Sequence, residues 1–289
     1  MTVRLTVLGT SPPIRSLDAG HAGTGTLLST AGSNLLIDCG PGVAKRFHET
    51  ANALSDLDGL VFTHHHWDHV SDIWTLVLGR WEESLYRAAE GLSLPDALAF
   101  YGPAGTERII ETLFGHDGLA RQDIDTRLEF GYRSFLPDGP GVFPHPVTTE
   151  LAPGESVRAA DCQIFVSGAS HCEPIMTSLS YRIETNGVVV AFAGDSGPSD
   201  DVVALAAGAD LLVHEGAVVA DPERPARSVH SDAITVGCTA AKAGVARLLL
   251  NHHMVDMNDE FTKAQITKQV RLNYDGEIII ADDLMVLEI

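Results

Sequence analysis

Cysteines are few in this sequence, and none of the four lies in a Cys-x-x-Cys pair. Their number and spacing argue against a disulfide framework and against a structural zinc ribbon. A reducing compartment is the simplest setting for such a chain, so we expect a cytoplasmic protein. The cysteines are Cys39, Cys162, Cys172 and Cys238.

Long apolar runs are also missing. No run approaches the roughly 20 residues that a helix needs to cross a bilayer. The N-terminal stretch MTVRLTVLGTSPP lacks the charged region and the long apolar region of a signal peptide, so we expect it to contain a first strand. The sequence predicts no membrane segment.

Positive charge is scarce. The chain has 19 Lys and Arg residues against 39 Asp and Glu residues, which gives a formal net charge of −20, and it has no basic run. Binding to a phosphate backbone needs clustered Lys and Arg side chains. The composition therefore disfavours a nucleic-acid partner, although it leaves room for a local basic groove.

Apolar residues make up 45% of the 289 residues, which is enough for a sizeable core. Strand-like stretches alternate with helix-like ones, and the two halves of the chain repeat this order. Two sheets packed face to face, with helices outside, would bury such strands on both faces. We expect one domain over residues 1–289, with a loop or lid over 115–154. The expected strands are 3–8, 24–29, 33–38, 59–62, 98–101, 162–167, 178–184, 188–192, 211–213 and 247–250, and the expected helices are 43–53, 70–87, 104–114, 200–207 and 232–243.

The stretch THHHWDHVSD, residues 63–72, follows an apolar strand and contains an HxHxDH pattern. Alternation along an extended segment sends His64 and His66 to the same side, and a turn can bring Asp68 and His69 beside them. Imidazole and carboxylate groups together suit a borderline divalent ion, zinc above all. The spacing fits two neighbouring metal ions better than a surface histidine run.

Three later residues could complete such a site. His171 follows the stretch FVSGAS, Asp195 follows VVVAFAG, and His252 follows LLLN. Each stands just past an apolar, strand-like run. A lone His or Asp at a strand end is commonplace, so the ordered set carries the prediction.

This ordered set resembles the metallo-β-lactamase superfamily over nearly the whole chain. Besides HxHxDH, the stretches VLGTSPP, LLIDCGPG and AGDS resemble landmarks of that family. The resemblance implies an α/β fold, a four-layer αββα sandwich, with a two-metal site at one edge of the sheets. It implies one ion held by His64, His66 and His171, a second held by Asp68, His69 and His252, and Asp195 as the bridge between them.

The family resemblance leaves some points open. His253 competes with His252 for the last ligand position, and His252 has the family's spacing. His65 lies between ligands and is expected to point away from them. The two ions are expected to be Zn²⁺, with Mn²⁺ or Fe²⁺ as alternatives.

The stretches VHEG and HSD resemble motifs of the branch that holds ribonuclease Z and its arylsulfatase-like and phosphodiesterase-like relatives. That branch implies that His230 assists the leaving group and that Glu215 orients His230. Asp68 is expected to orient or deprotonate the attacking water while it also binds metal. The alternatives are that His230 only caps a helix starting near Asp232 and that Glu215 only braces its loop.

We therefore expect a binuclear metal-dependent hydrolase of an ester-like bond, a phosphodiester or sulfate ester, in a small molecule. The acidic composition and the lack of a lysine-bearing arm argue against tRNA 3′-end processing of the ribonuclease Z type. That activity, lactone or thioester hydrolysis, and a non-catalytic metal-binding role stay as alternatives. A homodimer is expected because the relatives are commonly dimers.

Three aromatic residues are candidates for the substrate pocket. Trp67 lies inside the HxHxDH pattern, called the metal motif below, and is expected to form part of the pocket wall. Trp74 is seven residues before Trp81, so the two share one helix face, and we expect Trp81 to be a core or dimer-contact residue. Phe143 would reach the pocket if its loop folds over the site.

Overall fold

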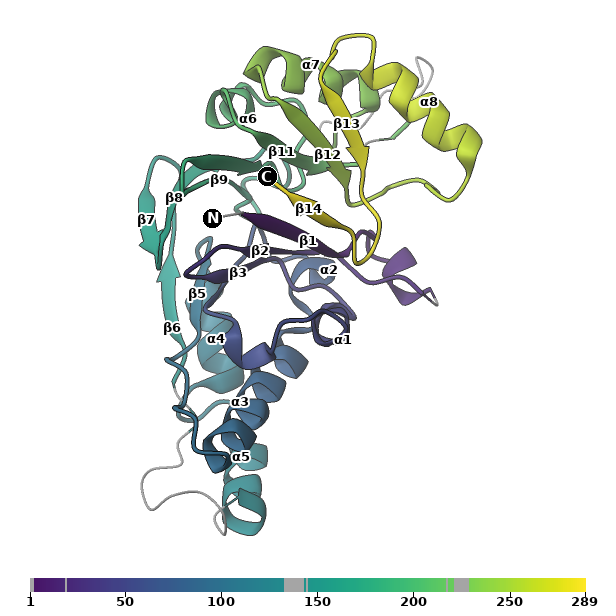
Figure 1. Cartoon of the computed structure of the whole chain (residues 1–289). Coiled ribbons are helices and arrows are strands. Elements are labelled where there is room, and N and C mark those ends of the chain that lie inside the picture. The colour runs from purple at the N-terminus through teal and green to yellow at the C-terminus, as the bar shows by residue number, and fades with distance from the viewer. Residues whose placement is uncertain (1–2, 19, 133–142, 144, 217, 221–228) are drawn as a thin grey trace.

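The computed structural model describes residues 3–18, 20–132, 143, 145–216, 218–220 and 229–289. The chain forms two seven-stranded mixed sheets that pack face to face (Figure 1). The first sheet has the order β14 (Val286–Glu288), β1 (Arg4–Gly9), β2 (Gly25–Ser29), β3 (Asn34–Ile37), β4 (Gly59–Val61), β5 (Ala99–Gly102), β6 (Val147–Glu150). The second sheet has the order β13 (Glu277–Ile280), β12 (Arg247–Asn251), β11 (Leu211–Glu215), β10 (Val188–Phe192), β9 (Leu179–Thr185), β8 (Cys162–Gly168), β7 (Ser156–Ala159).

Helices cover the outer face of each sheet, which confirms the four-layer αββα sandwich (Figure 1). Three apolar cores separate the layers: one under the helices of the first sheet, one between the sheets, and one under the helices of the second sheet. The first set of helices is α1 (Val43–His48), α2 (Trp67–Val70), α3 (Ile73–Ala89), α4 (Thr106–Phe114) and α5 (Arg121–Arg127). The second set is α6 (Asp200–Leu205), α7 (Ala233–Ala243) and α8 (Glu260–Val270).

Burial on both faces explains why the inner strands are apolar throughout. In β3, Leu35 and Ile37 point into the core between the sheets, whereas Leu36 points towards the helices. Successive side chains of a strand point to opposite faces, so a strand with both faces covered needs apolar residues at every position. Neighbouring residues of β2 also face opposite sides, since Leu27 packs under the helices and Leu28 packs between the sheets.

The stretch 115–154 is not the plain loop that the sequence predicted. It contains α5, a short π-helix at Leu128–Tyr132, and β6, which pairs in parallel with β5. Helix α5 buries only Ile124, so it has no apolar periodicity to detect, and ion pairs one turn apart join Arg121 to Asp125 and Arg127 to Asp123. Residues 133–142 and 144 of the expected lid lie outside the described residues.

Two expected helices are shorter or divided. The helix expected over 43–53 ends at His48, and a short 3₁₀ turn at Leu54–Asp56 precedes β4. The helix expected over 70–87 begins earlier as α2 and continues as α3, which buries Trp81 as expected. The division places Asp68 and His69 on a four-residue helix of their own, while His64 and His66 precede it.

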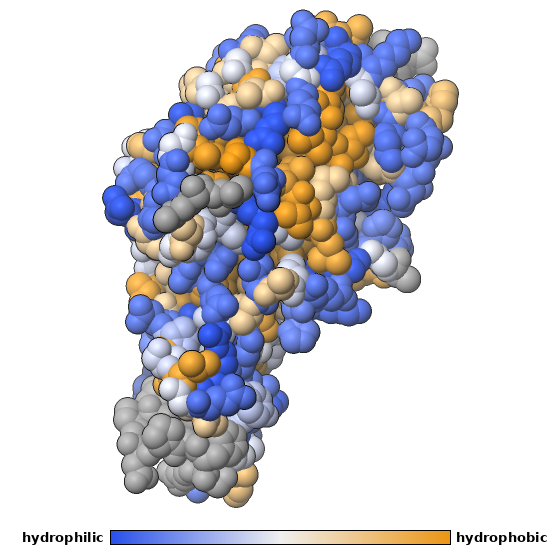
Figure 2. Space-filling model, viewed as in Figure 1, coloured by the Kyte–Doolittle hydropathy of each residue, from blue (hydrophilic) through white to orange (hydrophobic). Residues whose placement is uncertain are grey.

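Apolar side chains reach the surface along the edge where β13 and β14 end the two sheets. Figure 2 shows them as a hydrophobic strip on the face seen there, and the partly buried residues of these strands include Ile278, Ile280 and Leu287. No helix among the described residues has both the length and the apolar character needed to cross a bilayer.

Candidate metal centre

The candidate ligands follow the ends of strands from both sheets and meet at one edge of the sandwich. His64 comes after β4, and Asp68 and His69 lie in α2. The other sheet contributes its residues after β8, β10 and β12, which are His171, Asp195 and His252. Residues separated by almost two hundred positions are thus brought together by the packing of the sheets.

Three histidines form the first group. His64 Nε2 lies 2.9 Å from His66 Nδ1, and His171 Nε2 lies 3.3 Å from the same atom. Three ring nitrogens that face one point cannot all be satisfied by protons, because a neutral imidazole carries only one N–H. A cation at that point would satisfy all three.

Asp68, His69 and His252 form the second group. Asp68 Oδ2 lies 3.2 Å from His252 Nε2 and 3.5 Å from His69 Nε2. Asp68 Oδ1 and His69 Nε2 are buried, and within the described part of the chain neither has a hydrogen-bond partner. Unpaired buried polar atoms are costly, and a metal ion would provide their missing partner.

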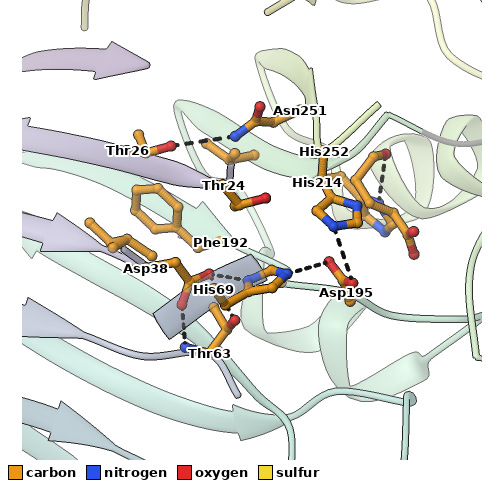
Figure 3. Close-up of a pocket in the computed structure, with 14 residues that line it drawn as sticks. Thr24, Thr26, Asp38, Thr63, His69, Phe192, Asp195, His214, Asn251 and His252 are labelled. Atoms are coloured by element: carbon orange, nitrogen blue, oxygen red, sulfur yellow. Dashed lines mark hydrogen bonds and ion pairs between the residues drawn. The ribbon is translucent and has the colours of Figure 1, made fainter. Parts of the chain in front are cut away.

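Asp195 lies between the two groups. Its Oδ1 is 3.7 Å from His69 Nε2, and its Oδ2 is 3.6 Å from His252 Nε2 and 4.0 Å from His171 Nε2 (Figure 3). The carboxylate therefore faces members of both groups. This placement agrees with the bridging position that the family resemblance implies.

The outer nitrogens of three candidate ligand histidines have protein partners. His69 Nδ1 donates to Asp38 Oδ2 at 2.8 Å, His64 Nδ1 lies 3.0 Å from Thr63 Oγ1, and His171 Nδ1 donates to the Val229 carbonyl at 2.8 Å. Such contacts set the tautomer and the orientation of a ligating ring. Each inner nitrogen is thereby left free to bind a cation.

Asp38 was not assigned a role from the sequence, although it lies in the landmark LLIDCGPG. Its carboxylate also accepts from the Thr63 N–H and hydroxyl, both at 2.8 Å, so it joins the end of β3 to the start of the metal motif. Its φ of 59° places this residue in the left-handed region, where a non-glycine residue is uncommon. An acidic residue directly after an apolar strand was the available signal.

The pKa values of the candidate ligands shift in both directions. Burial alone would lower the pKa values of His69 and His252, but the nearby carboxylates of Asp38, Asp195 and Asp68 outweigh it and raise both, so each of these rings would lose a proton when an ion binds. Burial and the nearby His69 charge lower the pKa of His64, so this ring is neutral. Burial alone would raise the pKa of Asp195, but the neighbouring His252 and His69 hold it well below its ordinary value. A neutral imidazole and an ionised carboxylate are the forms that bind metal.

His230 and Glu215 form a pair beside the candidate ligands. His230 Nδ1 donates to Glu215 Oε2 at 2.8 Å, and the His230 ring lies 4.9 Å from that of His171. The buried Oε1 of Glu215 accepts from the Ser196 and Ser231 N–H groups, so Glu215 also braces its loops. The N-cap of α7 is Asp232, whose side chain accepts from the Thr235 N–H. His230 therefore does not cap this helix.

His252, and not His253, faces the candidate ligands. The Nε2 of His253 donates to the Ala281 carbonyl at 2.8 Å, and burial lowers the pKa of this ring to about 4. His65 also points away, since its Nε2 lies 2.9 Å from Thr106 Oγ1 at the start of α4.

The proposed pocket residues lie in different settings. Trp67 and Trp74 are 44% and 37% exposed, so both indoles reach the surface. Phe143 is buried in the core under the first sheet, with ring centroids 5.8 Å from Trp81 and 6.2 Å from Phe114. The structure corrects the expectation for Phe143, whose apolar ring fills the core instead of lining the site.

Comparisons with known proteins agree with this geometry. A family model described as "Beta-lactamase superfamily domain" matches residues 33–253. A protein named ribonuclease Z from Mycolicibacterium gilvum (strain PYR-GCK) is 30% identical, with 98% of this chain and 94% of that protein covered.

Two solved structures share the fold. The metallo-β-lactamase fold protein YhfI from Bacillus subtilis has a TM-score of 0.72 and 22% identity, and both chains are covered completely. Human tRNase Z, short form, has a TM-score of 0.65 and 20% identity, with 98% of each chain covered.

These relatives overturn one expectation from the sequence. The relative named ribonuclease Z contradicts the prediction of a small-molecule substrate and of an unlikely nucleic-acid partner. The error arose because net charge sums the whole surface, whereas a bound substrate meets the local field at the site. A formal charge of −20 therefore does not decide what binds at one edge of the sandwich.

Proposed function

The chain belongs to the metallo-β-lactamase superfamily and is a metal-dependent hydrolase, and from this premise we propose that it is an endoribonuclease of the ribonuclease Z type. Its reaction would be hydrolysis of a phosphodiester bond at the 3′ side of precursor tRNA. The observation that carries the proposal is the approach of the His230–Glu215 pair to the ligand set, because hydrolysis needs both activated water and a proton for the leaving oxygen. The relative named ribonuclease Z supports RNA as the substrate. The four free cysteines support a reducing, cytoplasmic setting.

The ligand groups described above suit two divalent ions, and we propose zinc for both because imidazole and carboxylate ligands dominate. When bound, such ions supply an activated water and positive charge that stabilises the phosphoryl oxygens. The proposed ligands are His64, His66 and His171 for one ion, Asp68, His69 and His252 for the other, and Asp195 for both.

His230 would move the proton to the leaving oxygen. Burial lowers the pKa of this ring, but the hydrogen bond and charge of Glu215 outweigh it, and the pKa is raised. Because Nδ1 is held by Glu215, the opposite Nε2–H is the one available to donate. Glu215 is a positioning residue in this scheme.

Asp68 would act at the metals and on the water. One oxygen, Oδ2, faces His252 and His69, while Oδ1 is buried with no protein hydrogen-bond partner among the described residues. A carboxylate of this kind can bind metal through one oxygen and accept a hydrogen bond from water through the other.

The test is cleavage of a 5′-labelled precursor tRNA that carries a 3′ trailer. Wild-type protein should cut once at the trailer junction, lose activity when a chelator removes its metal, and regain it with added Zn²⁺. Asp195→Ala should abolish cleavage, whereas Asp117→Ala, at a fully exposed carboxylate, should not change it. A protein that holds two zinc ions and leaves precursor tRNA intact would contradict the proposal.

A further inference from the structure

A small cavity of about 30 Å³ lies on the inner side of the candidate ligands, between the two sheets. Its walls come from β2 and β3 of one sheet and from β10, β11 and β12 of the other. The polar residues at its walls include Thr24, Thr26, His214, Asn251 and His252 (Figure 3). This volume has room for one or two water molecules.

Besides His69 Nε2, which faces the candidate ligands, three buried polar atoms belong to residues that line this cavity. They are the Thr24 hydroxyl, Asn251 Oδ1 and His252 Nδ1, and none of the four has a hydrogen-bond partner in the described part of the chain. Figure 3 shows the Thr24 hydroxyl directed towards the His252 ring. Buried polar groups in proteins are nearly always paired, with protein or with ordered water.

His252 differs in this respect from three other candidate ligands. His64, His69 and His171 each place their outer nitrogen against a protein oxygen. A metal-binding histidine almost always donates its other N–H to a carboxylate, a carbonyl or water. For His252 no protein atom of the described chain fills that role, and the mostly apolar cavity beside it has several polar side chains in its walls.

We propose that this cavity is a binding site for ordered water that completes the hydrogen bonding of His252 and so orients it towards the metal. The water would accept from His252 Nδ1–H and donate to Asn251 Oδ1 and the Thr24 hydroxyl, which gives it three partners. Buried waters typically make about three hydrogen bonds. Thr24 and Asn251 are then positioning residues that act on the last ligand from the interior.

The inference rests on the proposed function in one respect, namely that His252 binds metal. It adds that the affinity of the ion held by Asp68, His69 and His252 depends on residues that touch neither metal nor RNA. The first-sheet strand β2 would thereby influence a ligand carried by the second sheet.

Zinc binding to the full chain, measured by competition with a chromophoric chelator, tests the inference without any RNA. Thr24→Val keeps the shape of the side chain and removes the hydroxyl, and we expect one of the two sites to bind Zn²⁺ about 10-fold more weakly. Thr6→Val is the matched control, because Thr6 of β1 is also buried and does not line the cavity. Asn251→Leu, which would fill the cavity, should weaken the same site.

Equal zinc affinities in wild type and Thr24→Val would overturn the inference. So would a high-resolution crystal structure of the zinc-loaded protein with no water within hydrogen-bond distance of His252 Nδ1. Circular dichroism of the metal-free variants guards against a folding defect, which would instead weaken both sites. Intact precursor tRNA with two zinc ions bound would reject the proposed function and leave this inference standing.

Discussion

At the scale of single residues, the contact between His230 and Glu215 shows how a surface loop is coupled to a buried charge. Glu215 is the last residue of β11 and is almost fully buried, whereas the His230 side chain is 22% exposed. This carboxylate accepts hydrogen bonds from two backbone N–H groups and one imidazole. The buried Glu215 holds the imidazole ring in place, and the partial exposure of His230 leaves the ring within reach of a substrate.

Replacing His230 by alanine tests the proton-donor role. We expect His230→Ala to lower kcat on precursor tRNA by about 10²- to 10⁴-fold, the usual range for loss of a general acid, while KM changes little. Single-turnover kinetics measures this. His116→Ala, at a fully exposed imidazole, should behave as wild type. An unchanged kcat in His230→Ala would exclude the role.

The pH profile tests the coupling to Glu215. The donor form of His230 is protonated, and its raised pKa keeps it protonated to higher pH, so kcat should fall only as pH rises through that value. Glu215→Gln removes the charge, so the falling limb should move to lower pH. The pair also stabilises the fold below the ordinary histidine pKa of about 6.5 and loses this contribution as pH rises. If the falling limb of the pH profile lies at the same pH in Glu215→Gln and in wild type, a group other than His230 is titrating.

Trp67 offers a third test at this scale. Its indole is exposed and lies between two candidate ligands in the sequence, where an unpaired base of the substrate could stack on it. We expect Trp67→Ala to raise KM for precursor tRNA about 10-fold, and Trp67→Phe to retain most of the affinity. Similar KM values for wild type, Trp67→Ala and Trp67→Phe would show that no substrate base stacks on Trp67.

At the scale of elements, the turn after β3 supports the short helix α2, which carries Asp68 and His69. Cys39 N–H donates to the His69 carbonyl at 2.6 Å, and Asp72 N–H donates to the Cys39 carbonyl at 3.1 Å. At Gly40 there is no room for a side chain, since an added Cβ would lie 2.0 Å from the Asp68 carbonyl oxygen. Helix α2 is therefore held against the β3–α1 turn by backbone contacts.

Gly40→Ala should consequently displace α2. We expect a loss of about 3 kcal/mol in the free energy of unfolding, as for an overpacked site, together with weaker zinc binding. Denaturant unfolding and zinc titration measure the two effects. Gly131→Ala is the control, because an added Cβ meets nothing within 4 Å there. Wild-type stability in Gly40→Ala would mean that the turn can shift without cost.

At the scale of the whole molecule, the proposed RNA substrate would bring a polyanion to one edge of a strongly acidic protein. The candidate ligands also lie where both sheets meet, so the core between the sheets holds their relative positions. Tyr181, which is fully buried in that core, donates from its hydroxyl to the Phe62 carbonyl at 2.7 Å and so links the second sheet to the strand before the metal motif.

The residues around the candidate ligands predict a shallow dependence on salt. Each phosphate contact to single-stranded RNA contributes about −0.7 to the slope of log affinity against log salt, and neither the candidate ligands nor the described residues that line the cavity beside them include Lys or Arg. We expect log(kcat/KM) for precursor tRNA to fall with a slope no steeper than about −3. A p-nitrophenyl phosphodiester controls for salt effects on the chemistry. A slope near −6 would reveal a basic surface that the composition hides.

The sequence by itself determined the parts of this protein that depend on local order. Apolar runs with both faces buried marked the inner strands, and the HxHxDH pattern with His171, Asp195 and His252 after later runs marked the ligand candidates. These signals are readable because strand alternation and ligand chemistry are properties of neighbouring residues.

Only the tertiary structure decided which groups share a site. It placed His252 rather than His253 at the centre, revealed Asp38 behind His69, moved Phe143 into the core, and showed α5 within an expected loop. Contacts between residues far apart in the chain depend on how the layers pack, and a helix without apolar periodicity leaves no pattern to read. The composition also misled on the substrate, because a summed charge carries no information about the field at one edge.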